Sequence, residues 1–284
     1  SGENEFNLTN WNLLLQLTSS RKMCIMIKIN VLKGNHMIAI ILAAGYATRL
    51  YPLTLNTPKP LLPLGEQLII DIIVEKLDHL PDLNSIVVIS NDRFFEQFYR
   101  WAEALDRTNK TPILVMNDGT TNESNKRGAI GDIEFVIKEL DIKEDVCILA
   151  GDNIFTYDLC KMYEFFKKKD APTLVAIDVP DKEEIKQLAV ATIGSDDKVI
   201  AMEEKPSNPK STWAIYATYF YRKEDLHYIE DYLLEGNSPD APGYFPSWLY
   251  RVIPVYAYRG VGTCIDIGTI ENYRKTFDQY SNQQ

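Results

Sequence analysis

Hydrophobic and polar residues follow two rhythms along residues 37–170. Short uncharged runs rich in Ile, Val and Leu predict strands that are buried on both faces of a parallel sheet. Between them lie longer segments whose apolar residues recur at helical spacing. The predicted strands are 38–44, 85–90, 111–116 and 145–150, and the predicted helices are 68–80, 94–105, 129–140 and 159–166. This alternation indicates a sheet with helices on both faces.

The pattern changes after residue 170, where strands follow one another through short turns. The predicted strands are 173–178, 188–193, 198–202, 212–221 and 255–259, with a turn at 194–197 and helices at 225–234 and 246–252. No linker rich in Pro, Gly or Ser separates the two halves, so we expect one continuous domain over residues 37–284. Its expected fold class is α/β: a Rossmann-like three-layer α/β/α sandwich with a central mixed, mostly parallel sheet.

Residues 1–36 stand outside this pattern. Ser1 and Gly2 are typical of a pair left behind by tag cleavage, and the apolar stretch 11–17 is followed, not preceded, by basic residues, unlike a signal peptide. We therefore expect an N-terminal extension without assigned function and a domain that starts near Met37. No segment approaches the roughly 18 apolar residues of a membrane helix.

The composition narrows the class of partners. The chain of 284 residues carries a formal net charge of −10, which argues against binding to nucleic acid or to an anionic membrane. Its four Cys show no paired spacing, which predicts reduced thiols and a cytoplasmic location. Its three His are scattered, so a His-based zinc site is not expected. Self-association is left open.

The loop after the first strand is a candidate phosphate site. Gly45, Ala47 and Thr48 keep the side chains small, so backbone N–H groups can approach an anion closely. Arg49 follows directly, and Lys59 lies between two prolines that stiffen the chain. Either cation could instead cap a helix or form a surface ion pair.

Two carboxylates and one charged cluster add to this site. Asp152 follows the strand 145–150, at the edge where open α/β sheets bind ligands, and carboxylate oxygens suit Mg²⁺. Asp266 precedes a helix that begins near residue 269, and is either a second ligand for the same metal or a helix-leading residue. Glu204 and Lys205 end a strand, and suit either a polyol phosphate or a solvated surface.

Taken in order, these motifs resemble one family. LAAGYATRL, then Lys59, GDNIF, EEKP followed by PKSTWA, and DIGT resemble the sugar-1-phosphate nucleotidyltransferases, and most closely the glucose-1-phosphate thymidylyltransferases. The resemblance covers residues 37–284. It implies a nucleotide side at about residues 37–170 and a sugar-phosphate side at about residues 171–284, with a nucleoside triphosphate and a sugar-1-phosphate as substrates.

The resemblance also implies residue roles. The catalytic residues would be Arg49, Lys59 and Asp152, with Mg²⁺ held by Asp152 and Asp266. The nucleotide-binding residues would be Leu42, Ala43, Ala44, Gly45, Tyr46, Ala47, Thr48 and Gly128. The sugar-phosphate-binding residues would be Asn153, Ala189, Glu204, Lys205 and Ile215.

Three positions depart from the family pattern. Ala47 and Ala189 stand where the family has glycine, and the segment 117–132 reads NDGTTNESNKRGAIGD in place of a Gln-rich base-reading segment. The last departure leaves the base open, although dTTP or UTP with glucose-1-phosphate is the favoured pair.

The implied reaction is the attack of a sugar-1-phosphate oxygen on the α-phosphorus, with release of pyrophosphate and formation of an NDP-sugar. Such chemistry depends on positioning and charge stabilisation. The alternatives are another acceptor (a heptose-1-phosphate, an amino-sugar phosphate or phosphocholine) or a non-catalytic regulatory subunit that binds nucleotide sugars. The presence of Arg49, Lys59, Asp152 and Asp266 together argues against the last of these.

Overall fold

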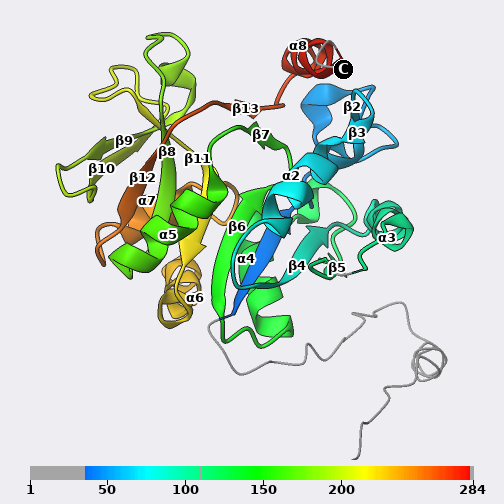
Figure 1. The fold of residues 1–284 in the computed structure, drawn as a ribbon, viewed down its shortest axis with the longest axis horizontal. Coiled ribbons are helices and arrows are strands. Elements are labelled where there is room, and N and C mark those ends of the chain that lie inside the picture. Colours follow the sequence, from blue (N-terminus) through cyan, green and yellow to red (C-terminus); the bar gives the residue numbers. More distant parts are fainter. Residues whose placement is uncertain (1–35, 109, 282–284) are drawn as a thin grey trace, which may run out of the picture.

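The computed structural model describes residues 36–108 and 110–281, so all but the last residue of the predicted extension (residues 1–36) lies outside them. A nine-stranded sheet forms the centre of the molecule (Figure 1). Its strands are β1 (Met37–Leu42), β4 (Leu83–Ser90), β5 (Ile113–Asn117), β6 (Asp145–Ala150), β8 (Thr173–Asp178), β9 (Ala189–Ile193), β10 (Val199–Glu204), β11 (Trp213–Tyr221) and β12 (Tyr256–Gly260). The helices are α2 (Ile69–Asp78), α3 (Phe95–Ala104), α4 (Ala129–Glu139), α5 (Leu159–Lys169), α6 (His227–Leu234), α7 (Tyr244–Leu249) and α8 (Ile270–Ser281).

The sheet is mixed and mostly parallel, as predicted. β1 pairs in parallel with β4 and β6, and β4 pairs in parallel with β5. β11 runs antiparallel to β6, β8 and β9, so these three strands share one direction. β12 is parallel to β8, and β10 is antiparallel to β9. The carboxyl ends of most strands therefore meet at one edge of the sheet, where ligands bind in open α/β folds.

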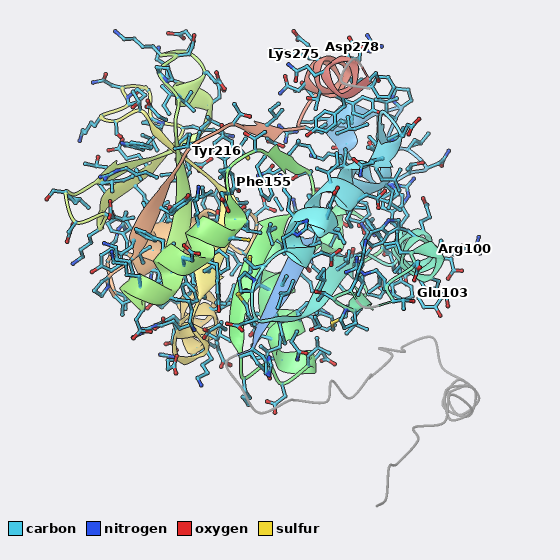
Figure 2. The ribbon with its side chains drawn as sticks, viewed as in Figure 1. Arg100, Glu103, Phe155, Tyr216, Lys275 and Asp278 are labelled. Carbon is cyan, nitrogen blue, oxygen red and sulfur yellow. The ribbon has the colours of Figure 1, made fainter. Side chains whose placement is uncertain are left out.

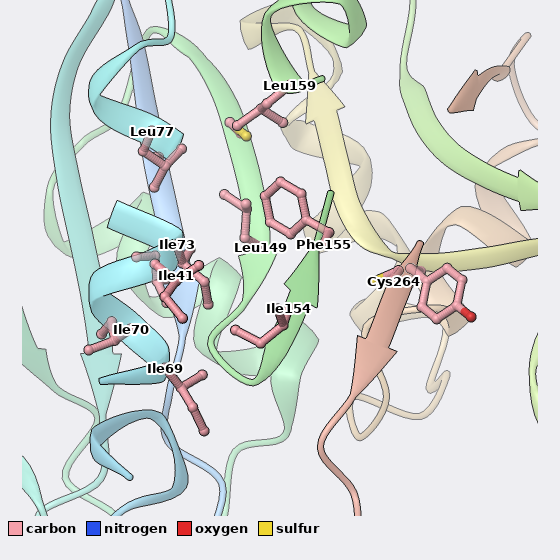
Figure 3. Close-up of a cluster of buried hydrophobic side chains, with 14 of the residues drawn as sticks. Ile41, Ile69, Ile70, Ile73, Leu77, Leu149, Ile154, Phe155, Leu159 and Cys264 are labelled. Atoms are coloured by element: carbon pink, nitrogen blue, oxygen red, sulfur yellow. The ribbon is translucent and has the colours of Figure 1, made fainter. Parts of the chain in front are cut away.

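The side chains of β1 pack against helices on both faces of the sheet, which gives the molecule three layers. Alternate side chains of a strand point to opposite faces, and Ala39 and Ile41 join the apolar cluster that α2, α3 and α5 cover. Ile38 and Ile40 join the second cluster, which α4, α6 and α7 cover. Figure 3 shows the first cluster, with the side chains of α2 directed toward Ile41. The predicted three-layer sandwich is confirmed.

Four short strands were not predicted. They are β2 (Pro63–Leu64), β3 (Gln67–Leu68), β7 (Asn153–Phe155) and β13 (Cys264–Asp266). β7 and β13 form a separate antiparallel pair that places Asp266 opposite Asn153. They are too short for an alternating pattern to show, since β7 and β13 have three residues each. In Figure 1 this pair crosses above the sheet and connects the β8–β11 side to the β2–β3 side.

The helix α7 also differs from its prediction, because it begins at Tyr244 and ends at Leu249. Within the described part of the chain, none of the helices combines the length and the apolar character that a bilayer-spanning helix requires.

Candidate active site

The loop that follows β1 is fixed by hydrogen bonds to its backbone and has free space at its glycine. The backbone N–H of Ala43 donates to the carbonyl of Ile89, at 3.0 Å, and Asn91 Nδ2 donates to the carbonyl of Ala44, at 2.8 Å. A Cβ atom added at Gly45 would meet no other heavy atom within 4 Å. The predicted nucleotide-binding residues 42–48 therefore run from the end of β1 through one loop to the start of a 3₁₀ helix, with free space at Gly45.

Ala47 adopts a left-handed backbone conformation, with φ 47° and ψ 41°. The hydroxyl of Thr54 donates to the carbonyl of Ala47, at 2.7 Å, and helps to hold this turn. For a residue with a Cβ this conformation costs about 1–2 kcal/mol, which is the physical reason for glycine here in the family pattern. The turn leads into the 3₁₀ helix Thr48–Leu50, on which Arg49 is exposed to solvent.

Lys59 reaches the end of β6 through a tightly packed junction. It begins the 3₁₀ helix Lys59–Leu61, whose Pro60 lies against Gly151. A Cβ atom at Gly151 would lie 2.9 Å from the carbonyl oxygen of Leu42 and 3.2 Å from Pro60 Cγ. Because the glycine allows this approach, the Lys59 ammonium reaches the Asp152 carboxylate and pairs with it.

Asp266 joins this ion pair from the other end of the sequence. The β7–β13 pairing brings Asp266 Oδ1 to 3.9 Å from Lys59 Nζ. The backbone N–H of Ile267 also donates to the Asp152 carbonyl, at 3.3 Å. The Lys59 side chain is 11% exposed, whereas the Asp152 and Asp266 side chains are 28% and 52% exposed. The lysine is therefore buried behind two carboxylates that solvent reaches.

Several charged residues predicted for the site influence the pKa of Asp266. Burial and the neighbouring Asp152 carboxylate raise the pKa of Asp266, while Lys59, Arg49 and Lys205 lower it. Arg49 and Lys59 come from the predicted nucleotide side, and Lys205 comes from the predicted sugar-phosphate side. The charges of residues from the two predicted sides thus act on one carboxylate.

The predicted sugar-phosphate residues lie on β7, β9 and β11 and at the end of β10. Glu204 and Lys205 are exposed at the end of β10, with 4.0 Å between Lys205 Nζ and Glu204 Oε1. Ala189 and Ile215 are register partners on β9 and β11, and Ile215 is buried. Asn153 is also buried, directly after Asp152.

Tyr216 was missed by the sequence analysis. It lies between Ile215 and the centre of β11, and it shares a buried cluster with Phe155 and Cys264. Figure 2 labels Tyr216 and Phe155. Burial raises the pKa of Tyr216, and the negative charge of Asp266 is among the smaller causes. Tyr216 therefore supports the β7–β13 pair near the carboxylates. A tyrosine inside an apolar strand gives no sequence signal beyond that of core packing.

Gly128 has a packing role in the structure. Its backbone φ is 80°, and a Cβ atom there would lie 2.5 Å from the carbonyl oxygen of Pro239. It precedes α4 and ends the polar loop that follows β5. Its contact with a nucleobase remains a prediction.

The donor set at Asp152 and Asp266 fits a hard divalent cation. Two accessible carboxylates share a site and repel each other, and both supply oxygen ligands. Within residues 36–108 and 110–281, no three His, Cys, Asp or Glu side chains cluster in a way that could hold a metal ion. A cation here would therefore need water or substrate phosphate oxygens as further ligands, which is the usual state of Mg²⁺.

Comparison with known proteins decides the family. The family model described as nucleotidyl transferase matches residues 38–283. The chain belongs to the nucleotidyl transferase family. This family match spans both sides of the candidate site, from β1 to the last helix.

Relatives within the nucleotidyl transferase family include two glucose-1-phosphate adenylyltransferases. The one from Clostridium novyi (strain NT) is 32% identical over 251 residues, which are 83% of this chain and 64% of the relative. The one from Mycoplasma mobile is 28% identical over 262 residues, which are 87% of this chain and 68% of the relative. The chain thus spans about two thirds of the length of these relatives, and less than two thirds of the first.

Solved structures share the fold at lower identity. A Bacillus anthracis protein assigned as a glucose-1-phosphate thymidylyltransferase matches with a TM-score of 0.72 at 23% identity, covering 87% of this chain and 96% of that one. A UDP-glucose pyrophosphorylase complexed with UDP-glucose matches with a TM-score of 0.74 at 17% identity, covering 88% and 100%. These matches confirm the predicted fold class.

Proposed function

We propose that this chain transfers a nucleotidyl group from a nucleoside triphosphate to a sugar-1-phosphate, with glucose-1-phosphate as the favoured acceptor. The observation that carries the proposal is the meeting of Lys59, Asp152 and Asp266, contributed by three separate segments of the chain. Family membership supports the reaction class. The names of the relatives have glucose in common and differ in the nucleotide, so they support the acceptor more strongly than the base.

The charges suit the joining of two polyanions. An oxygen of the sugar-1-phosphate attacks the α-phosphorus and forms a new P–O bond, while the bond to the β-phosphate breaks and pyrophosphate leaves. The phosphate is already ionised at neutral pH, so no general base is needed. Arg49 and Lys59 hold the triphosphate and offset the charge that builds up in the transition state, and Lys205 orients the acceptor phosphate.

Asp152 and Asp266 would hold Mg²⁺, which would supply further neutralisation of the phosphate oxygens. Until substrates arrive, the Lys59 ammonium pairs with Asp152 and limits the repulsion between the two carboxylates. In this proposal Lys59 exchanges that partner for a phosphate when the nucleotide binds.

A matrix of pyrophosphate-release assays tests the proposal. Wild-type protein is incubated with Mg²⁺, with dTTP, UTP, ATP, CTP or GTP, and with glucose-1-phosphate, galactose-1-phosphate, mannose-1-phosphate, glucosamine-1-phosphate or phosphocholine. We expect turnover with glucose-1-phosphate and at least one of dTTP, UTP and ATP. Absence of turnover with every pair would reject the proposed function, and turnover confined to phosphocholine would reject its acceptor.

A further inference from the structure

One buried acid lies in the base-side loop (residues 117–128), and a second lies in the helix that follows this loop. Asp118 begins this loop after β5, and Asp132 lies in the first turn of α4. Asp118 is 2% exposed and Asp132 is 6% exposed, and each of the two carboxyl groups acts on the pKa of the other. Two adjacent buried carboxylates repel each other strongly when both are ionised. We therefore expect the pair to hold one proton.

The hydrogen bonds around the pair indicate where that proton resides. The backbone N–H of Thr120 donates to Asp118 Oδ1, at 2.7 Å, and the Thr120 hydroxyl lies 2.8 and 2.9 Å from the two Asp118 oxygens. Asp132 Oδ1 has no hydrogen-bond partner among the described residues. Donors therefore favour an ionised Asp118, and a proton on Asp132 makes it a donor to Asp118 as well.

The pair is connected to the nucleotide-binding loop through Thr120. The Thr120 oxygen that faces Asp118 lies 3.4 Å from the hydroxyl of Tyr46, which is buried. The Thr120 carbonyl accepts from the Asp92 backbone N–H, at 2.9 Å, next to the residue that holds Ala44. The base-side loop is thereby fixed against the loop that follows β1.

We propose that Asp118 and Asp132 share one proton and act as positioning residues, which hold the base-side loop against Tyr46 and so set the affinity for the nucleoside triphosphate. This inference rests on the proposed nucleotidyl transfer. The pair touches neither the reacting atoms nor the Lys59–Asp152–Asp266 cluster. Its contribution is therefore to nucleotide binding, through the geometry of the loop.

Charged groups near the pair allow a pH prediction. Burial and the Asp118 carboxylate raise the pKa of Asp132 to about 8, and Arg127 acts in the opposite direction. Burial also raises the pKa of Tyr46, on which Asp118, Glu123 and Arg93 act as well. Tyr46 thus stays neutral up to pH 9, and the shared proton is the group in this network that is lost near pH 8.

The matched variants are Asp132→Asn, Asp132→Ala and Thr120→Val. The asparagine amide of Asp132→Asn presents an N–H donor to Asp118 in place of the acid proton, whereas the alanine of Asp132→Ala presents none. Thr120→Val keeps the shape of threonine and removes the hydroxyl between Asp118 and Tyr46. Asp225→Asn is the control, because Asp225 is a buried acid paired with Arg222 at 2.7 Å outside this site.

The first readout is the KM for the nucleotide that wild type uses best, at saturating glucose-1-phosphate between pH 6.5 and 9. We expect Asp132→Ala and Thr120→Val to raise this KM about fivefold to tenfold, as the loss of one buried hydrogen bond predicts, with kcat within about twofold. Asp132→Asn and Asp225→Asn should keep the wild-type KM at pH 7.

Above pH 8 the KM for the nucleotide should rise in wild type and stay flat in Asp132→Asn. An unchanged KM in Asp132→Ala, or an equally raised KM in Asp132→Asn, would overturn the proposal.

The second readout is independent of turnover. The folded pKa of Asp132 lies above its ordinary value, so wild type loses stability as the pH rises toward about 8, and Asp132→Asn does not share this loss. The melting temperature of Asp132→Asn minus that of wild type should therefore grow from pH 5 to pH 8. A constant difference would overturn the shared proton.

If wild type turns over no substrate pair, the proposed function fails, and the melting profile still decides the shared proton. The positioning role is then tested by the rise in melting temperature that each Mg²⁺–nucleotide produces in wild type and in Asp132→Ala. Equal rises would overturn that role, and a rise that only wild type shows would support it.

Discussion

The proposed nucleotide side and the proposed sugar-phosphate side differ in how firmly their predicted site residues are held. On the nucleotide side, side chains hold the loop backbone directly: Asn91 donates to Ala44, and Thr54 donates to Ala47. On the sugar-phosphate side, Glu204 and Lys205 are exposed and lie 4.0 Å apart, and Lys210 and Glu203 lie 3.7 Å apart. Exposed pairs of this kind contribute little stability.

In our proposal, this difference separates the roles of the two sides in catalysis and in acceptor binding. Preorganised groups act without reordering when charge develops, so the nucleotide side suits the reacting phosphates. Exposed charged side chains suit an acceptor that they contact only when it binds. Variants on the nucleotide side should therefore change turnover, and variants on the sugar-phosphate side should change the KM of the acceptor.

The largest effect is expected for Arg49→Ala and Asp152→Asn. Each removes a charge from the reaction centre, and such losses cost about 10²- to 10³-fold in kcat. Initial rates of pyrophosphate release measure the effect, and circular dichroism melting checks the fold. Near-normal rates in either folded variant would contradict the assignment of the reacting side.

A smaller effect is expected for Lys205→Ala. The loss of a charge-assisted hydrogen bond to the acceptor phosphate should raise the KM for glucose-1-phosphate about tenfold to a hundredfold, with an unchanged nucleotide KM. The control is Lys210→Ala, because Lys210 is also exposed and paired with a glutamate. If both variants raised the KM for glucose-1-phosphate equally, general electrostatic attraction would explain the effect, and the specific contact of Lys205 would be rejected.

The next effect concerns folding. Gly151→Ala forces a Cβ atom to 2.9 Å from the Leu42 carbonyl, and such overpacking should lower the free energy of unfolding by about 1–3 kcal/mol. Gly45→Ala is the matched control, because a Cβ atom there meets open space. Urea unfolding of both variants measures the difference. Equal stability would mean that the junction between β1 and β6 relaxes freely.

The smallest effect is expected for Ala47→Gly. Glycine relieves the left-handed strain at this position but has more freedom to lose on folding, so the net gain should be about 0.5–1 kcal/mol. A melting temperature that rises slightly supports the observed turn. A clear fall would show that Ala47 is held in a conformation that alanine prefers.

Much of the parallel core could be predicted from the sequence. The strand β1, and β6 apart from its first residue Asp145, appear as uncharged apolar runs, and the ligand-binding edge of such a sheet follows from general rules. Asp152 was therefore found from its position after β6, and Lys59 from its place near the first loop. The same reasoning could have found Asn91, which follows β4 in the same way.

Other features depend on contacts between distant residues. β13 pairs with β7 through only three residues, so no alternation in the sequence indicates the strand that brings Asp266 to Lys59. The pairing of Asp118 with Asp132 depends on how α4 packs beside the loop, and the sequence shows merely a polar segment. Such sites follow from tertiary packing, which local patterns do not encode.

Asp266→Asn most directly tests our proposal that the β7–β13 pairing completes a reaction centre built from the nucleotide side and the sugar-phosphate side. Pyrophosphate release is measured at saturating Mg²⁺, glucose-1-phosphate and the preferred nucleotide, together with the melting temperature. We predict that the rate falls at least about a hundredfold, while the melting temperature stays within about 3 °C of wild type. A folded Asp266→Asn variant with a near-wild-type rate would contradict the account.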